Sequence, residues 1–204
     1  MDLDLDKYKK AWGNQSEETN KVSKIDIYRM AHSKSSSIVK WIFIIGLLEF
    51  VFLNSLYFVF DMEEAYNEYK QLGLYNFMIY SQFIIYPVLL YFLVKFYLNY
   101  KSISVVDSTK TLMNKIIKTR KTVKHYVLFN LLYVFIFGII VAIAALKTHP
   151  EFNSQQVLIS IIVTVITLII MLVIIWCFYQ LLYGILLRKL NKNYKELAKL
   201  EELN

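Results

Sequence analysis

The chain has 204 residues, of which 57% are hydrophobic, and a net charge of +7 at pH 7. That apolar share exceeds the roughly 45–50% of soluble domains, which excludes an ordinary soluble globular protein. The single cysteine, Cys177, excludes an intrachain disulfide. The acidic N-terminus has no apolar core in its first thirty residues, so we do not expect a cleavable signal peptide.

Four apolar runs are long enough to cross a bilayer, which takes roughly 20 residues. They are residues 41–60, 75–100, 126–146 and 157–187. We therefore predict an all-α integral membrane protein, with four transmembrane helices bundled within residues 38–187. At 1.5 Å per residue the fourth run is about 46 Å long, so its helix must tilt or protrude.

The positive charges are distributed asymmetrically about these runs. All but two of the 23 Lys and Arg residues fall in residues 1–40, 95–124 and 188–204; Lys70 and Lys147 are the exceptions. Because cytoplasmic loops carry the excess of Lys and Arg, we predict a multi-pass protein of the bacterial inner membrane with both termini cytosolic. Anionic lipid headgroups explain the basic excess, and we do not expect nucleic acid as a partner.

Residues 1–37 form a predicted cytosolic arm. Leu5, Tyr8 and Trp12 fall on one stripe of a short amphipathic helix, and Ser23 with Asp26 resembles the start of a second helix. The arm could lie on lipid, dock a cytosolic protein or be disordered. In the docking reading, Tyr8 and Trp12 are the contact residues.

The basic connection, residues 101–125, has the pattern of a cationic amphipathic helix. Asp107 is a plausible N-cap, and Leu112, Ile116 and Val123 recur at helical spacing. Such a helix is apt to lie in the headgroup plane, although it could instead extend the third span into the cytosol. A helix that binds calmodulin or nucleic acid would share the pattern. The lipid-headgroup candidates are Lys110, Lys115, Lys118, Arg120, Lys121 and Lys124.

Residues 188–204 are expected to continue the fourth span as a cytosolic helix. Leu190, Tyr194 and Leu197 follow Leu187 with a heptad-like spacing that is too short for a coiled coil. The pattern indicates a contact face, and we interpret these three residues as partner-docking candidates. The partner could be a cytosolic protein, a membrane protein or a second copy of the chain.

Polar side chains inside the spans mark a further candidate site. Glu49, Lys95, Asn130 and Gln180 each lie about 6–12 Å from the cytosolic end of their spans at 1.5 Å per residue. We predict that they form one intramembrane polar layer whose hydrogen bonds fix helix packing. Ionisable groups at this depth can also serve proton or ion transport. Lys95 could alternatively extend to the interface.

The sequence offers no expected catalytic or cofactor site. His32, His125 and His149 lack the spacing of metal ligands, and the chain contains no P-loop, GxSxG or CxxC motif. We therefore expect no enzyme activity, no metal and no cofactor.

Three segments carry a family resemblance: DLDKYKKAW at the start, SSSIVKWIFIIGLLEF entering the first span, and DSTKTLMNKIIKTRKTVKHYVLFN entering the third. The chain resembles uncharacterised four-span proteins of Bacteroidetes, especially flavobacteria, that are often labelled beta-carotene 15,15'-monooxygenase. We reject that label, because carotenoid cleavage oxygenases are β-propellers that hold iron with four histidines and this chain has three. The family also resembles genes that lie beside sigma-factor genes, and this resemblance implies an anti-sigma or signalling role for the cytosolic arm.

Together these features predict a non-enzymatic binding or regulatory protein that presents cytosolic helices to a partner, in its narrower form an anti-sigma-like tether. An accessory or scaffold subunit of a larger membrane complex is the first alternative. A small transporter or channel that uses Glu49 is the second.

Overall fold

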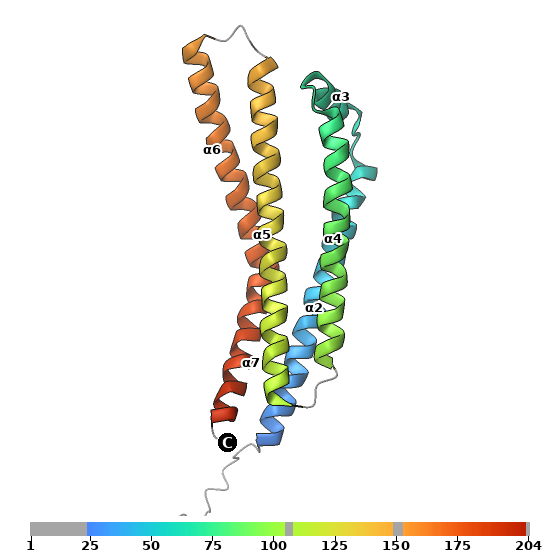
Figure 1. Ribbon diagram of the computed structural model, residues 1–204, viewed down its shortest axis with the longest axis vertical. Helices are drawn as coiled ribbons and strands as arrows, with labels where there is room; N and C mark the ends of the chain where they lie inside the picture. The colour runs from blue at the N-terminus through green and yellow to red at the C-terminus, as the bar shows by residue number, and fades with distance from the viewer. Residues whose placement is uncertain (1–23, 105–107, 149–152, 203–204) are drawn as a thin grey trace, which may run out of the picture.

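The computed structural model describes residues 24–104, 108–148 and 153–202, and within them it contains helices and no strands (Figure 1). The helices are α2 (Lys24–Val59), α3 (Glu63–Gln71), α4 (Tyr75–Ser104), α5 (Thr109–Thr148), α6 (Ser154–Tyr179) and α7 (Ile185–Glu202). A π-helical turn, η1 (Gln180–Gly184), joins α6 to α7 without a break.

The helices end where local chemistry provides caps. Asn153 and Gln156 form a capping box at the start of α6. Ser108 accepts a hydrogen bond from the Thr111 N–H at the start of α5, so Ser108 is the cap there; the predicted cap, Asp107, lies outside the described residues. After α3, Gly73 has a φ of 68°, the left-handed conformation that glycine adopts without steric cost.

Four helices are long and apolar enough to cross a membrane: α2, α4, α5 and the continuous α6–η1–α7. Many of their large apolar side chains are exposed, including Phe58, Phe83 and Leu181, which are 92%, 74% and 70% exposed. In water such exposure would be unfavourable, so these surfaces fit a lipid environment. The fold thus indicates a multi-pass membrane protein.

The two ends of the bundle differ in charge and packing. We call the end where α2 and α5 begin and α4 and α7 end the basic end; it lies at the bottom of Figure 1. The opposite end, which carries α3 with Glu63, Glu64 and Glu68, is the acidic end. Toward the acidic end, α5 and α6 diverge from α2 and α4 (Figure 1).

At the basic end, residues 24–40, 97–104, 109–124 and 185–202 pack as a compact four-helix unit, which we call the stalk. Its buried apolar residues are Ala31, Val39, Ile103, Leu112, Ile116, Val123, Leu190, Leu197 and Leu200. Hydrogen bonds between its helices include Asn193 Nδ2 to Ser35 Oγ at 3.0 Å, Asn99 Nδ2 to Thr122 Oγ1 at 3.1 Å, and His32 Nε2 to the Ile103 carbonyl at 2.8 Å.

The stalk bears on two sequence interpretations. The predicted boundary between residues 37 and 38 lies inside α2, and the basic connection forms the first half of α5. The structure therefore favours the second of the two readings of this segment, in which it extends the helix of the third span. The physical reason is its apolar stripe, because Leu112, Ile116 and Val123 are fully buried inside the protein.

Candidate functional site

The most unusual polar group of the protein is a buried carboxyl near the middle of the bundle. Glu49 of α2 is 7% exposed. Its Oε1 accepts a hydrogen bond from the Tyr179 hydroxyl and its Oε2 accepts one from the Tyr183 hydroxyl, both at 2.8 Å. The hydroxyl of Tyr126 also interacts with this carboxyl. We call these four residues the Glu49–tyrosine cluster.

Elements from all parts of the chain position this cluster. Tyr179 ends α6 and Tyr183 lies in the π turn η1, and their rings stack with centroids 6.1 Å apart. Residues four apart share one side of a helix, which points both hydroxyls toward α2. The Tyr126 ring, on α5, makes edge contacts with both, at 5.9 Å in each case.

Aromatic side chains of α4 close the cluster from another side. Phe92 and Phe96 lie 5.4 and 5.3 Å from the Tyr126 ring, between centroids. Phe96 is fully buried, and it lies against Gly46, one turn before Glu49 on α2. The cluster therefore ties together α2, α4, α5 and the α6–α7 junction.

The hydrogen bonds of the cluster hold α2 against the α6–α7 junction. Two phenol donors occupy both carboxyl oxygens, and aromatic rings separate the group from solvent. π-helical turns occur frequently at functional sites, and here the turn carries one of the two donors. No group of three or more His, Cys, Asp or Glu residues that could hold a metal occurs in the described ranges.

The predicted polar layer is not brought together as expected. Lys95 lies over the ring of Tyr91 on its own helix, with Nζ 5.4 Å from the centroid. Asn130 Nδ2 donates to the Tyr126 carbonyl, so it adjoins the cluster through the backbone. Gln180 is exposed beside Gly184. Glu49 thus takes phenol partners in place of Lys95, because the neighbouring helices turn tyrosines toward it.

The sequence signal for these partners is an i, i+4 pair of tyrosines, Tyr179 and Tyr183, at the depth of Glu49. Tyrosines near span ends are ordinarily interface anchors. Only the packing distinguishes an anchor from a hydrogen-bond donor that faces inward.

The predicted docking seam is part of the protein's own core. Leu190 and Leu197 are fully buried, and Tyr194 packs against the same core. This corrects the prediction that the seam is free for a partner: a heptad-like stripe must be covered, and α2 and α5 cover it. Tyr8 and Trp12 lie outside the described residues.

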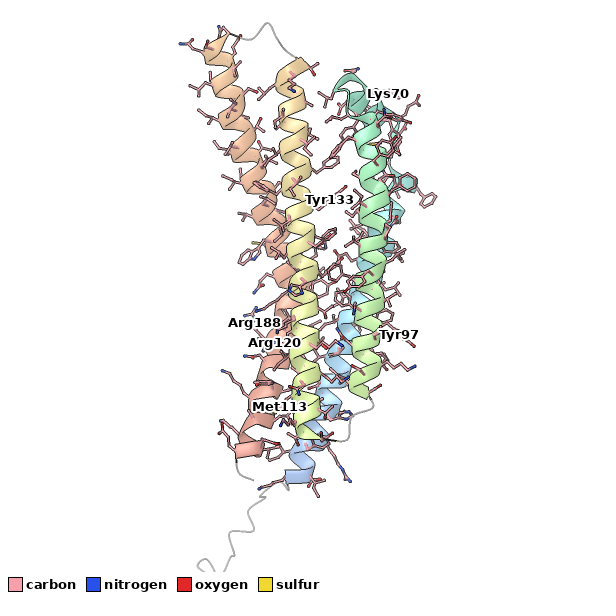
Figure 2. The ribbon with its side chains drawn as sticks, viewed as in Figure 1. Lys70, Tyr97, Met113, Arg120, Tyr133 and Arg188 are labelled. Atoms are coloured by element: carbon pink, nitrogen blue, oxygen red, sulfur yellow. The ribbon has the colours of Figure 1, made fainter. Side chains whose placement is uncertain are left out.

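The predicted lipid-headgroup residues lie along α5 in the stalk. Lys110, Lys118, Lys121 and Lys124 are exposed, and Lys115 and Arg120 are partly buried. Figure 2 labels Arg120 on α5 and Arg188 on α7, both in the stalk. From Lys110 to Lys124 the helix rises about 21 Å at 1.5 Å per residue, so one headgroup layer cannot contact all six. Lys121 and Lys124, nearest the apolar segment, remain the headgroup candidates.

A groove between α2 and α7 adds a polar surface to the stalk. Ser33, Lys34 and Ser37 of α2 line it on one side, and Lys189, Lys192 and Glu196 of α7 line the other. Its volume is about 540 Å³. With three lysines against one glutamate, the groove is suited to acidic side chains.

The model of one protein family, described as a domain of unknown function (DUF8845), matches residues 25–202. No curated protein and no solved structure matches the chain. The matched range includes the stalk from its second residue and the whole Glu49–tyrosine cluster.

Proposed function

We propose that this chain, which belongs to the DUF8845 family, is a multi-pass protein of the bacterial inner membrane that docks an acidic protein partner through its stalk. The stalk lies in the cytosol in this proposal, and both termini are cytosolic. The proposed role is regulatory and does not require catalysis.

The observation that carries this proposal is the continuity of the helices. α2, α4, α5 and α6–η1–α7 pass from apolar surfaces into a stalk with its own buried core and an exposed basic surface. A bundle of unbroken helices holds the α2–α7 groove at a fixed distance from the apolar region. Lys24, at which α2 begins, lies at this same end.

We first expect a fixed topology. Single cysteines placed in a Cys177→Ser background at Asn67 and Gln155 should react with a membrane-impermeant maleimide added outside intact cells. Cysteines at Asn114 and Glu201 should react only after the membrane is permeabilised, because lysine-rich segments stay in the cytosol. All four positions are exposed, so burial does not explain a missing signal. External labelling at Asn114 would overturn the orientation.

We next expect partner capture to depend on the groove. The double variant Lys189→Glu, Lys192→Glu should lose, by tenfold or more, a cytosolic protein that co-purifies with the wild type in mild detergent. The two introduced glutamates would repel the acidic residues of the partner. Quantitative mass spectrometry of cross-linked membranes measures the loss.

The matched control is Lys70→Glu, Lys147→Glu, which makes the same change in net charge outside the stalk. It should retain the partner. Equal loss in both variants would show that overall charge, and not the groove, governs binding. A sigma factor as the retained protein would support the narrower anti-sigma proposal, and Trp12→Ala would then test whether the arm shares in docking.

An accessory role in a larger membrane complex is the second proposal, and α6 favours it. Among the described residues, Tyr179 is the only buried residue of α6. The remaining apolar surface could be covered by an integral membrane partner or by lipid. Co-purification of integral membrane proteins that survives both double variants would support this reading over the first.

A further inference from the structure

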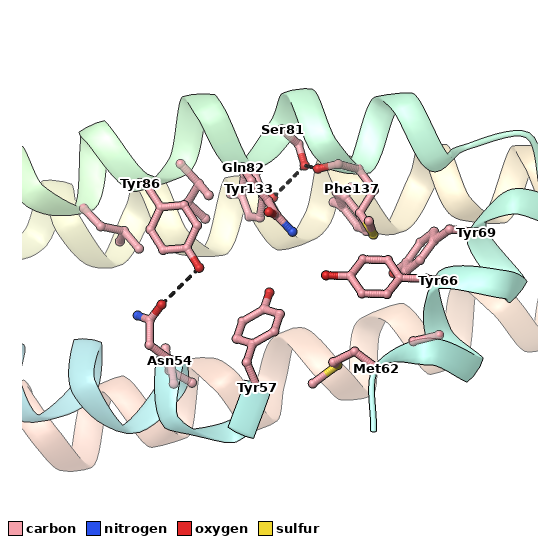
Figure 3. A pocket seen from close by; sticks show the side chains of 15 residues that line it. Asn54, Tyr57, Met62, Tyr66, Tyr69, Ser81, Gln82, Tyr86, Tyr133 and Phe137 are labelled. Carbon is pink, nitrogen blue, oxygen red and sulfur yellow. Dashed lines mark hydrogen bonds between the residues drawn. The ribbon is translucent and has the colours of Figure 1, made fainter. Parts of the chain in front are cut away.

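A cavity of about 400 Å³ lies at the acidic end, between α2, α3, α4 and α5 (Figure 3). Six of its lining side chains are aromatic: Tyr57, Tyr66, Tyr69, Tyr86, Tyr133 and Phe137. Tyr69 of α3 packs edge-on against Phe137 of α5, with centroids 6.1 Å apart, so α3 bridges toward α5 across this end. The volume is within the range of small-molecule sites.

Some polar groups of the wall are engaged in the fold. The Tyr86 hydroxyl donates to Asn54 Oδ1 at 3.0 Å, and the Tyr133 hydroxyl donates to Ser81 Oγ at 3.3 Å. These bonds link α4 to α2 and to α5, as Figure 3 shows. They hold the wall in place without help from a ligand.

Other polar groups of the wall are unpaired. Within the part of the chain that the structure describes, no hydrogen bond is found for the hydroxyls of Tyr66 and Tyr69 or for the amide of Gln82. In Figure 3 the Tyr66 hydroxyl and the Gln82 amide point toward the cavity. Tyrosine hydroxyls are ordinarily protonated at neutral pH, and burial raises the pKa of Tyr69 further, so this hydroxyl is a donor. Convergent polar groups on an apolar wall are typical of ligand sites.

Among the residues that the structure describes, none that lines the cavity is charged. Asp61, Glu63, Glu64 and Glu68 line a separate hollow on the outer side of α3. A charged ligand in the cavity would therefore lose water without gaining a counter-charge, which is strongly unfavourable. The lining instead matches an uncharged molecule.

An aromatic belt is the alternative reading of so many tyrosines near one end of a bundle. Belt tyrosines place their hydroxyls at the headgroup level, around the outside of the helices. Tyr66 and Tyr69 instead turn toward a space enclosed by four helices. Tyr133 likewise projects from α5 toward α4 (Figure 2).

We propose that this cavity binds an uncharged, ring-containing small molecule that carries one or two oxygen atoms able to accept hydrogen bonds. The rings of the ligand stack against the aromatic wall. Its oxygen atoms receive the hydroxyls of Tyr66 and Tyr69 and the amide of Gln82. The proposal is independent of what the stalk binds.

Photolabelling of the full chain in phosphatidylcholine vesicles tests it. The probe is 2-naphthol bearing a small diazirine group, and mass spectrometry maps the labelled residues. Labelling should be saturable and concentrated on cavity residues of α3 and α4. Unlabelled 2-naphthol should compete, whereas 2-naphthoate and 2-naphthyltrimethylammonium should compete at least tenfold more weakly, because each brings an uncompensated charge.

Two variants separate the cavity from general partitioning into lipid. Ala65→Trp fills the cavity from α3 and should abolish specific labelling, while the control Asn67→Trp, exposed on the same helix, should retain it. The combination Tyr66→Phe, Tyr69→Phe, Gln82→Leu preserves the wall but removes its free polar groups, and should weaken competition by about tenfold. Labelling spread over α6 and unchanged in every variant would overturn the proposal, as would equal competition by the charged analogues.

Discussion

Replacing Glu49 with leucine should lower the free energy of unfolding by about 2–4 kcal/mol, since each buried polar group left without a partner costs about 1–3 kcal/mol. The variant leaves the hydroxyls of Tyr179 and Tyr183 unpaired, and these side chains are 7% and 1% exposed. Circular dichroism during unfolding in mixed SDS micelles measures the change. The matched control is Glu64→Leu on the exposed face of α3, expected within about 0.5 kcal/mol of wild type.

Glu49→Gln should be far milder, with a loss of about 1 kcal/mol or less. The amide oxygen still accepts from one hydroxyl, and the amide nitrogen can donate to the other. This pair of variants therefore separates hydrogen bonding from charge. If glutamine lowered the free energy of unfolding as much as leucine does, hydrogen bonding alone would not explain the role of Glu49. That result would point to a requirement for the carboxyl group itself.

A double-mutant cycle assigns the loss to the cluster. Tyr183→Phe alone should cost about 1 kcal/mol, whereas in the Glu49→Leu background it should recover part of the lost stability, because it removes a buried hydroxyl that has already lost its partner. The transporter reading is tested with the same variants in vesicles. A proton or ion flux in the wild type that Glu49→Gln eliminates would support transport and contradict the docking proposal.

Gly46→Leu should destabilise the protein by about 3 kcal/mol, at the upper end of the cost of overpacking. A Cβ at this position would lie 3.0 Å from Cδ2 and 3.2 Å from Cε2 of Phe96. Phe96 is fully buried and contacts Tyr126 and Tyr183, so it cannot move without disturbing the Glu49–tyrosine cluster. Small residues at such positions let helices in membranes approach closely.

The control is Gly138→Leu on α5, which should cost clearly less. A Cβ there would meet Cδ2 of Leu168, the far end of a flexible side chain that is only partly buried. A second-site change provides a further check. Phe96→Leu should recover part of the stability lost in Gly46→Leu, and failure to recover any would show that the loss does not arise at this contact.

The basic connection, residues 101–125, is a segment whose sequence pattern does not determine where its helix lies. Leu112, Ile116 and Val123 have the same spacing whether their helix lies flat on lipid or stands in a bundle. Both environments bury an apolar stripe and leave lysines exposed. The choice depends on α2 and α7, which present a complementary apolar surface, and no local pattern contains that information.

The seam of Leu190, Tyr194 and Leu197 makes the same point for docking. Its spacing correctly indicates a face that must be covered. It cannot distinguish cover by the same chain from cover by a partner, because both use the same apolar contacts. The free surface of the stalk is therefore the α2–α7 groove and not this seam.

By itself, the sequence of this protein determined the four long apolar helices and the separation of basic from acidic ends. Hydropathy, length and charge are properties of consecutive residues, so they need no knowledge of neighbours in space. The tertiary structure alone decided which side chains meet. Lys95 and Glu49 share a predicted depth, yet the rotation of each helix about its axis leaves Lys95 beside Tyr91 of its own helix and brings Tyr179 and Tyr183 to Glu49. That rotation is set by side-chain packing across the whole bundle, including the π turn at residues 180–184.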